Sequence, residues 1–369
     1  MSSPSPEKLR RTFDLEHLDI DSLTPWSSVH RGRTRDGAQV VIKRTASSQD
    51  RAHAMADWTR ALADAGVRTV TPADITVANP RPVARPDQPG QGYDDAAEPR
   101  QDQPERIGPD GEERPDWWVA YPFVPGRAYS GSAGDIEAAG DLLGRIHAVD
   151  LPPALRRAMR PYAWPETHRH EVDEDLQTLA DVLRRHGGNR AGQAIATVGA
   201  LAERWWSTAF PQLHAEDTAD QLPRAGVPGD YKASNLVFIE EREQGPSEPV
   251  LVDPDNGGIE PRIFDLALAV VLFHNECPGA PGRLLTPTEW HRFASAYTRH
   301  VDLTDRERAL WPLALDHMLW EEGTWVLEDN DDAAWADPRQ GAHLLDLALT
   351  TPDRYRLPPS PRGGTAPRT

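Results

Sequence analysis

Apolar and polar residues along the first third of the chain alternate with a period of two, which predicts a sheet. Residues 28–34 alternate, 35–37 form a turn that ends in glycine, and 39–43 is a β-branched run, so a hairpin is expected. A short strand is expected over 67–78. The aromatic and aliphatic run 117–124 predicts a further, buried strand.

Between these predicted strands, the spacing of apolar residues changes to that of a helix. Apolar Met55, Trp58 and Leu62 fall on one face of a helix predicted over 47–65, and Gly66 is a typical helix stop. Helical spacing then dominates the second half of the chain. Helices are expected over residues 133–147, 176–185, 191–210 and 263–277, with two or three more within 287–349.

Three segments lack the apolar residues that an ordered core needs. Residues 79–116 carry eight prolines and many charges, so we expect a mobile insertion between strands. Residues 1–10 are expected to be a disordered lead. The stretch 352–369, with its Pro-Pro and Gly-Gly pairs, is expected to be a disordered tail.

Composition and charge exclude several classes of protein. The net charge of −18 and the pI near 5.1 argue against binding to nucleic acid or to anionic lipid. One cysteine, Cys277, excludes an intramolecular disulfide and a thiolate metal cluster. No apolar run reaches the ~18 residues that a membrane helix needs, and no signal peptide is evident, so a cytoplasmic protein is expected.

The candidate chemistry lies in the polar loop Gly229–Phe238. Asp230 is followed five residues later by Asn235 and then by an apolar run, and Asp253 follows a second apolar run. If the two runs pair as a hairpin through the polar turn 240–248, these three side chains gather at one end of a small sheet. Such oxygen ligands suit a divalent cation and a hydroxyl nucleophile, as phosphoryl transfer requires.

Four segments resemble a known family in this order and at suitable spacing. They are Val40–Lys43, Leu142–Ala148, Gly229–Leu236, and Val252–Asp255 followed by Pro261–Ala267. The chain resembles the aminoglycoside phosphotransferase and choline kinase group of small-molecule kinases, which share the protein-kinase fold. Those segments are similar to the family's strand lysine, its Leu-Gly-x-Leu-His-Ala helix, its Gly-Asp-x-x-x-x-Asn catalytic loop, and its metal-binding aspartate with the helix after it.

The resemblance implies an α+β, bilobal protein-kinase-like fold. A small N-terminal lobe over 11–125, with an antiparallel sheet and one helix, is expected to bind the nucleotide. A larger, mainly helical lobe over 126–351 is expected to carry the catalytic loop and the acceptor site.

The resemblance also assigns roles to residues of the catalytic loop. Asp230 would orient the acceptor hydroxyl, and Lys232 would compensate charge in the transition state. Asn235 and Asp253 would ligate Mg²⁺, with Asp255 as a further candidate ligand.

On the nucleotide side, ATP or GTP would contact five residues. Lys43 would pair with the α- and β-phosphates, and a turn that includes Ser27 and Ser28 would cover the phosphates. The backbone of Tyr121 and Phe123 would contact the base.

The chain departs from the family pattern in three places. Pro228 stands where the family has a histidine, the turn before residue 28 has no glycine, and Asp57 stands near the position of the glutamate that pairs with the strand lysine. His147 is interpreted as a structural histidine. Asp265 is interpreted as a brace for the catalytic loop.

The acceptor is expected to be a small, cationic molecule with a hydroxyl, such as an aminoglycoside-like antibiotic or its biosynthetic intermediate. Carboxylates interleaved with tryptophans suit a cation, although they equally fit a solvated helix with core tryptophans. These residues are Glu321, Glu322, Asp329, Asp331, Asp332 and Asp337 with Trp320, Trp325 and Trp335. Two alternatives stay open: a kinase acting on Ser or Thr of a peptide precursor, and a catalytically weak kinase-like binding protein.

Overall fold

The computed structural model describes residues 6–24, 28–45, 49–73, 118–239 and 248–359. Ser27 and the expected insertion 79–116 lie outside these residues. The chain divides into two compact units. The first unit comprises Met1–Pro125 and Pro152–Arg160, and the second comprises Gly126–Leu151 and Pro161–Thr369.

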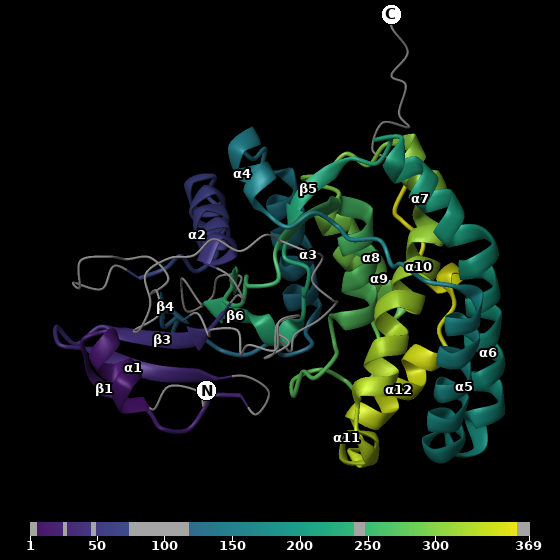
Figure 1. Ribbon diagram of the computed structural model, residues 1–369, viewed down its shortest axis with the longest axis horizontal. Coiled ribbons are helices and arrows are strands. Elements are labelled where there is room, and N and C mark those ends of the chain that lie inside the picture. The colour runs from purple at the N-terminus through teal and green to yellow at the C-terminus, as the bar shows by residue number, and fades with distance from the viewer. Residues whose placement is uncertain (1–5, 25–27, 46–48, 74–117, 240–247, 360–369) are drawn as a thin grey trace, which may run out of the picture. The chain divides into compact units, whose positions relative to one another are not determined.

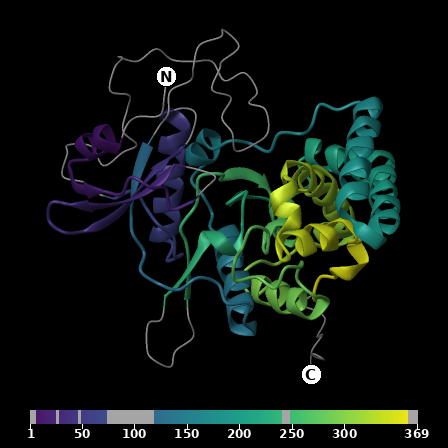
Figure 2. The same cartoon turned by 90° about the horizontal axis from the view of Figure 1, so that it is seen from below.

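The first unit contains a four-stranded antiparallel sheet in the order β1-β2-β3-β4 (purple to blue in Figure 2). The strands are β1 (Leu15–Leu18), β2 (Val29–Thr34), β3 (Gln39–Arg44) and β4 (Trp118–Pro122). The predicted β2–β3 hairpin is confirmed, because Arg33 pairs with Gln39 and Gly37 takes a φ of 91° in the turn. That φ lies in the left-handed region, which glycine adopts without strain.

The expectation of disorder over residues 1–10 is wrong for its second half. Residues Pro6–Thr12 form helix α1, whose Leu9 shares a core with Phe13, Val40 and Trp118. A strand over 67–78 is also wrong for the described residues up to Ala73. Instead of a series of strand-pairing hydrogen bonds, the Ala73 amide donates one backbone hydrogen bond to the Ala120 carbonyl, at 2.7 Å.

Two more helices complete the first unit. Helix α2 spans Gln49–Asp64, buries Trp58 and Leu62 as its spacing predicts, and ends before Gly66, whose φ is 78°. Helix α4 spans Pro153–Ala158 and contacts α2.

The second unit is mainly helical, with two short antiparallel strand pairs. Figure 1 shows α5 and α6 side by side, with α10 beside them. The helices are α3 (Ala133–Ala148), α5 (Arg169–His186), α6 (Ala191–Arg204), α7 (Phe210–Thr218), α8 (Arg262–Leu272), α9 (Pro287–Tyr297), α10 (Asp305–Asp329), α11 (Asp332–Ala336) and α12 (Gln340–Ala348). The strands are β5 (Arg224–Val227), β6 (Leu236–Ile239), β7 (Glu248–Leu251) and β8 (Gly258–Pro261). A π-helical turn, Trp205–Ala209, joins α6 to α7.

Helix α8 forms the centre of this unit, since every residue from Ile263 to Leu272 is buried. The expected disordered tail is wrong for residues 352–359. Tyr355 is fully buried, its hydroxyl donates to the Leu285 carbonyl at 3.0 Å, and its own carbonyl accepts from the Trp311 indole. The buried Tyr355 ring and these hydrogen bonds hold residues 352–359 in an ordered conformation, although the prolines of this segment had suggested disorder.

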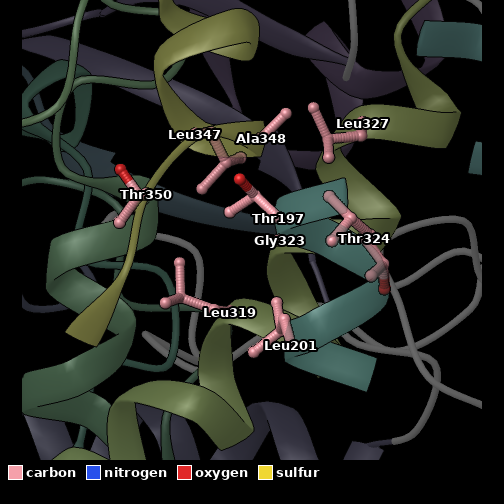
Figure 3. A pocket seen from close by; sticks show the side chains of 10 residues that line it. Thr197, Leu201, Leu319, Gly323, Thr324, Leu327, Leu347, Ala348 and Thr350 are labelled. Carbon is pink, nitrogen blue, oxygen red and sulfur yellow. The ribbon is translucent and has the colours of Figure 1, made fainter. Parts of the chain in front are cut away.

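A small cavity lies between α6, α10 and α12 (Figure 3). Thr197 and Thr350 line it, but their hydroxyls donate to carbonyls of α6 and α12, at 3.0 Å to Gln193 and 2.8 Å to Asp346. The space is about 10 Å³, barely that of one water molecule. It is a packing gap beside Gly323 and has no room for a ligand. Among the described residues, no helix is long and apolar enough to cross a membrane.

Glycines in two helices should respond oppositely to alanine. At Gly140 of α3 a Cβ would lie 2.2 Å from the Phe293 carbonyl oxygen of α9, whereas at Gly323 the nearest atom is 3.6 Å away. We expect Gly140→Ala to destabilise the protein by about 1–3 kcal/mol through overpacking. Gly323→Ala should stabilise it by about 1 kcal/mol through helix propensity. Denaturant unfolding of both variants measures this; equal shifts would contradict the close α3–α9 packing.

The buried imidazole of His343 in α12 should make stability depend on pH. Burial lowers the pKa of His343 to about 4, and the neighbouring His274 lowers it as well. The unfolded chain therefore binds more protons below about pH 6.5, so stability is lost as pH falls from there, by up to about 1.4 kcal/mol per unit. We expect His343→Leu to flatten this dependence in denaturant unfolding, while exposed His291→Gln keeps the wild-type slope.

Candidate active site

The loop Gly229–Asn235 connects β5 to β6, and strand register places its end beside Asp253. Leu236 of β6 pairs with Leu251 of β7, and the Val252 amide donates to the Asn235 carbonyl at 3.0 Å. Asp253 follows directly, so Asn235 and Asp253 lie at the same end of the hairpin. The predicted hairpin is confirmed, although its turn, 240–247, lies outside the described residues.

The Asn235 carboxamide is oriented by Asp230. Its Nδ2 donates to the Asp230 carbonyl at 2.9 Å and to the Asp230 Oδ2 at 3.2 Å. Because both contacts use Nδ2, the carboxamide oxygen is the atom that a cation can use. Together with the Asp253 carboxylate it makes a hard oxygen donor set of the kind that Mg²⁺ prefers, so the residues present fit a divalent cation.

Lys232 joins the site with a partner that the sequence did not reveal. Its ammonium lies 3.3 Å from Asp230 Oδ1 and 3.2 Å from Glu276 Oε2. Glu276 follows α8, and nothing in its sequence context distinguishes it from a surface glutamate.

Gly229 can only be glycine in this conformation. Its φ is 68°, and a Cβ here would lie 2.5 Å from the Asn256 carbonyl oxygen. Its amide donates to Asp265 Oδ1 at 2.9 Å. The loop thus turns sharply at Gly229, which presents Asp230 next to Asn235.

Asp265 and His147 form a buried brace beneath this turn. His147 Nε2 lies 3.0 Å from Asp265 Oδ2, its Nδ1 lies 3.0 Å from the Tyr297 hydroxyl, and the side chains of His147 and Asp265 are fully buried. The structural interpretations of His147 and Asp265 are confirmed. The loop is therefore braced from α8, with Pro228 in the place of the family histidine.

Tyr231 anchors the loop to α3. The ring is fully buried, and its hydroxyl donates to the Ala139 carbonyl at 2.8 Å. Burial raises the pKa of Tyr231 well above its ordinary value, with a smaller contribution from Asp265. Tyr231 therefore stays neutral and structural.

Asp255 lies in the turn before β8, where the Gly257 amide donates to the Pro254 carbonyl at 3.1 Å, and its side chain is nearly buried. Its role as a metal ligand stays a prediction.

The expected nucleotide-binding residues lie in the first unit. Lys43 is in β3, opposite Val29 and Val119. The Ser28 carbonyl accepts the Arg44 amide at 3.0 Å, and the Phe123 amide donates to the Gln39 carbonyl at 3.0 Å.

Tyr121 is buried in β4. Asp57 is exposed on α2, and its carboxylate forms an ion pair with Arg60 of the same helix, at 2.9 Å. Within the second unit, the described contacts bring together Asp230, Lys232 and Asn235, and the strand register places Asp253 at the same end of the hairpin.

Three acidic residues among the C-terminal tryptophans, Asp331, Asp332 and Asp337, have structural partners. Asp331 caps α11, and backbone hydrogen bonds from Gln340 and Arg339 lower the pKa of Asp337. Asp332 pairs with His186 at 3.2 Å. Trp320 and Trp335 are buried. These contacts favour the interpretation as a solvated helix with core tryptophans over that as a cation site.

Comparison with known proteins gives one family and several similar folds. The profile of the phosphotransferase enzyme family (APH) matches residues 26–311. A search of curated proteins finds no match.

Three solved structures share the fold at low sequence identity. The spectinomycin phosphotransferase APH(9)-Ia, in complex with ADP and spectinomycin, is 12% identical with a TM-score of 0.55, over 95% of this chain and 97% of its own. The microcompartment-associated aminopropanol kinase is 14% identical with a TM-score of 0.54, over 92% of each chain. The amicoumacin kinase hAmiN, with AMP-PNP, Ca²⁺ and its ligand Ami, is 16% identical with a TM-score of 0.53, over 95% and 94%. The kinase-like fold expected from the sequence is thereby confirmed.

The brace beneath Gly229 can be tested by two substitutions at Asp265. Asp265→Ala leaves the Gly229 amide and His147 without their partner, so we expect a loss of about 3 kcal/mol in unfolding free energy. Asp265→Asn keeps an acceptor oxygen for the Gly229 amide and should lose clearly less. Denaturant unfolding separates the two, and equal losses would show that the Gly229 hydrogen bond contributes nothing.

Proposed function

This chain belongs to the phosphotransferase enzyme family, and from that premise we propose that it transfers the γ-phosphate of a nucleoside triphosphate to a hydroxyl of a small, cationic molecule. The observation that carries the proposal is the convergence of Asp230, Asn235 and Asp253 at one end of the β6–β7 hairpin. A carboxylate for the hydroxyl and oxygen ligands for a cation are what phosphoryl transfer needs.

Asp230 has the main role in the transfer. The acceptor oxygen forms a bond to the γ-phosphorus while the bond to the β–γ bridging oxygen breaks, and the hydroxyl proton passes to the Asp230 carboxylate. Because the transition state is loose, orientation of the hydroxyl contributes more than strong base catalysis. The Asn235 contact and the Gly229 turn hold the Asp230 carboxylate in place.

Asn235 and Asp253 would hold the divalent cation, with Asp255 as a further candidate. When bound, Mg²⁺ supplies positive charge to the phosphate oxygens. The fold neighbour that holds AMP-PNP together with Ca²⁺ supports a metal–nucleotide substrate, and ADP in a second neighbour supports ATP over GTP.

The scarcity of lysine singles out two candidate phosphate-binding residues. The chain has three lysines, Lys8, Lys43 and Lys232, whereas all its other basic side chains are arginines or histidines. An ammonium is a compact point charge, while a guanidinium prefers planar, bidentate partners. Lysine at 43 and 232 supports their proposed roles, Lys43 at the α- and β-phosphates and Lys232 at the transferred group.

Ser28, Tyr121 and Phe123, together with Ser27, complete the proposed nucleotide contacts. The Arg31 guanidinium carbon lies over the Phe123 ring, 4.3 Å from the ring centroid. Tyr121 pairs with Val41 in the sheet. These contacts fix the backbone of the segment, which is the part proposed to contact the base.

The acceptor class follows from charge and from the fold neighbours. Spectinomycin, amicoumacin and aminopropanol are named for those proteins, and a net charge of −18 suits a cationic acceptor. Modification of an antibiotic, as resistance or as a biosynthetic step in the cytoplasm, is the setting we propose. The ion pair of Lys232 with Asp230 favours a second candidate, a peptide Ser or Thr as the acceptor.

Two substitutions separate binding from chemistry. We expect Asp253→Ala to abolish Mg²⁺-dependent binding of ATP because the cation loses its carboxylate. Asp230→Ala should bind MgATP within about threefold of wild type while turnover falls by at least about a hundredfold. Calorimetric titration with MgATP, and a coupled assay with spectinomycin, aminopropanol and a Ser-containing peptide as acceptors, measure these effects.

Exposed Asp220→Asn serves as the matched control and should behave as wild type in both assays. Absence of any nucleotide binding by the wild type, or equal binding by wild type and Asp253→Ala, would contradict the proposal. Binding without turnover of any acceptor would indicate a kinase-like binding protein.

A further inference from the structure

Lys232 lies between two carboxylates and not in a simple ion pair. Its Nζ is 3.3 Å from Asp230 Oδ1 and 3.2 Å from Glu276 Oε2. The side chains of Lys232, Asp230 and Glu276 are 13%, 17% and 33% exposed, so water screens these charges only in part. The three groups together carry one net negative charge.

The backbone of Glu276 is strained. Its φ is 52°, in the left-handed region that side chains other than Gly, Asn and Asp rarely adopt. The other described non-glycine residues with positive φ are Asp14 and Asp220, both of a type that tolerates it. Such strain costs about 1–3 kcal/mol and concentrates at functional sites. It therefore calls for an explanation at Glu276.

Hydrogen bonds hold Glu276 in this conformation. The Glu276 amide donates to Gln340 Oε1 at 3.2 Å, and Gln340 Nε2 donates to Asn275 Oδ1 at 2.8 Å and to Asn330 Oδ1 at 3.3 Å. Because Gln340 Nε2 donates to these two asparagines, the Gln340 Oε1 atom is the one that faces the Glu276 amide. Helices α10 and α12 thus fix the position of the Glu276 backbone.

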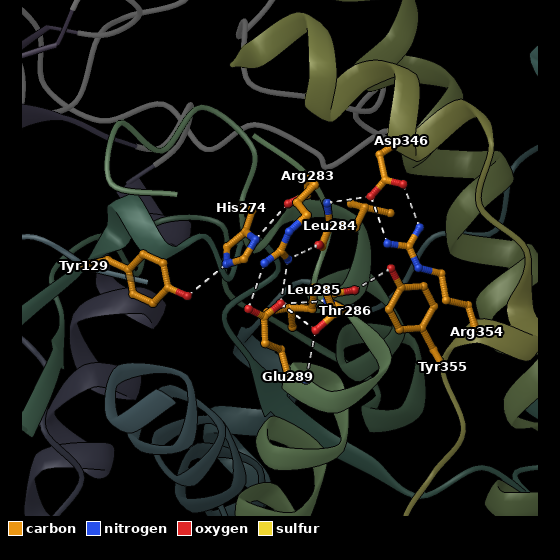
Figure 4. A network of polar contacts seen from close by, with 10 residues as sticks. All are labelled: Tyr129, His274, Arg283, Leu284, Leu285, Thr286, Glu289, Asp346, Arg354 and Tyr355. Atoms are coloured by element: carbon orange, nitrogen blue, oxygen red, sulfur yellow. Dashed lines mark hydrogen bonds and ion pairs between the residues drawn. The ribbon is translucent and has the colours of Figure 1, made fainter. Parts of the chain in front are cut away.

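The segments that carry Lys232 and Glu276 are also tied to each other. The Ala233 amide donates to the Phe273 carbonyl at 2.8 Å, which joins the catalytic loop to the end of α8. Beyond it, His274 lies between the Tyr129 hydroxyl at 2.9 Å and the Arg283 carbonyl at 2.8 Å (Figure 4). Both ends of the Lys232–Glu276 contact are therefore anchored in rigid structure.

We propose that Glu276 is a positioning residue that shares the Lys232 ammonium with Asp230 and holds it in place for phosphoryl transfer. The inference rests on the proposed function. Glu276 places a second carboxylate 3.2 Å from the Lys232 ammonium, opposite the Asp230 contact at 3.3 Å, and so holds the ammonium at a fixed position beside Asp230.

A purely structural role for Glu276 makes different predictions. If Glu276 only ordered the loop, the loss of its carboxylate would lower the stability of the protein. Activity would then fall whether or not Lys232 is present. A positioning role acts through the ammonium. The effect of removing the Glu276 charge then disappears once Lys232 is replaced, which a double-mutant cycle measures.

The first experiment follows Lys232 directly by NMR of the full chain with ¹³C-labelled lysine. Only three lysine side chains contribute signals, and Lys232→Arg and Lys43→Arg assign two of them. We expect Glu276→Gln to shift the Lys232 signal at fixed pH, because the carboxylate 3.2 Å from its Nζ is lost. The Lys8 and Lys43 signals, and all signals in Asp220→Asn, should keep their positions. An unchanged Lys232 signal would overturn the proposal.

The second experiment measures turnover of MgATP, with water as the acceptor, in a cycle of Glu276→Gln and Lys232→Met. We expect Glu276→Gln to lower kcat about tenfold with KM nearly unchanged, and to have less than about a twofold effect when Lys232 is methionine. Equal losses in both backgrounds would overturn the positioning role. If the wild type turns over no MgATP with water or with any acceptor of the coupled assay, the proposed function fails instead, and the NMR result still decides whether Glu276 holds Lys232.

Glu276→Gly separates strain from charge. Glycine adopts a φ of 52° without strain, so this variant should unfold at higher denaturant concentration than the wild type while its kcat falls as in Glu276→Gln. A variant that gained stability and kept full kcat would show that the carboxylate is dispensable.

Discussion

The loop Gly229–Asn235 depends on one buried carboxylate, that of Asp265. Its two oxygens hold the Gly229 amide and the His147 imidazole, and His147 reaches the Tyr297 hydroxyl on α9. A buried Asp265 carboxylate is costly in free energy unless both of its oxygens have hydrogen-bond partners. The contacts of Asp265 with Gly229 and with His147 therefore depend on each other. Because the brace fixes Gly229 in a left-handed conformation, it also fixes the direction in which Asp230 leaves the strand.

The unit around this brace is built so that helices approach closely. Gly140 and Gly144 of α3 lie against the Phe293 and Tyr297 carbonyls of α9, where a side chain would not fit. Gly144 and His147 lie on the same helix, one turn apart, so one sequence motif provides both the close approach and the buried imidazole. The close packing of α3 on α9 and the position of the proposed catalytic loop are thus coupled through α3.

Much of this site was predictable from local patterns. The apolar runs after Asp230 and before Asp253 predict paired strands, and the register that follows brings Asn235 beside Asp253. The kinase-like order of the motifs predicts the fold, which the family match and the fold neighbours confirm.

Other features depend on contacts between distant segments, and the sequence could not predict them. Leu9 and Tyr355 lie in stretches that look disordered, yet each is buried by elements far away in the chain. Glu276 reaches Lys232 only because α8 ends beside the catalytic loop. Likewise, the acidic residues around Trp335 suggest a cation site by composition, whereas caps and ion pairs account for three of them.

Asp230 and its neighbours are proposed to transfer a phosphoryl group to a hydroxyl. The most direct test is ³¹P NMR of the full chain with MgATP and spectinomycin or aminopropanol as the acceptor. We expect a new phosphate-ester resonance that grows as the γ-phosphate signal declines, and that is absent with Asp230→Asn. A γ-phosphate signal that stays constant, or an ester that forms equally fast with Asp230→Asn, would contradict it.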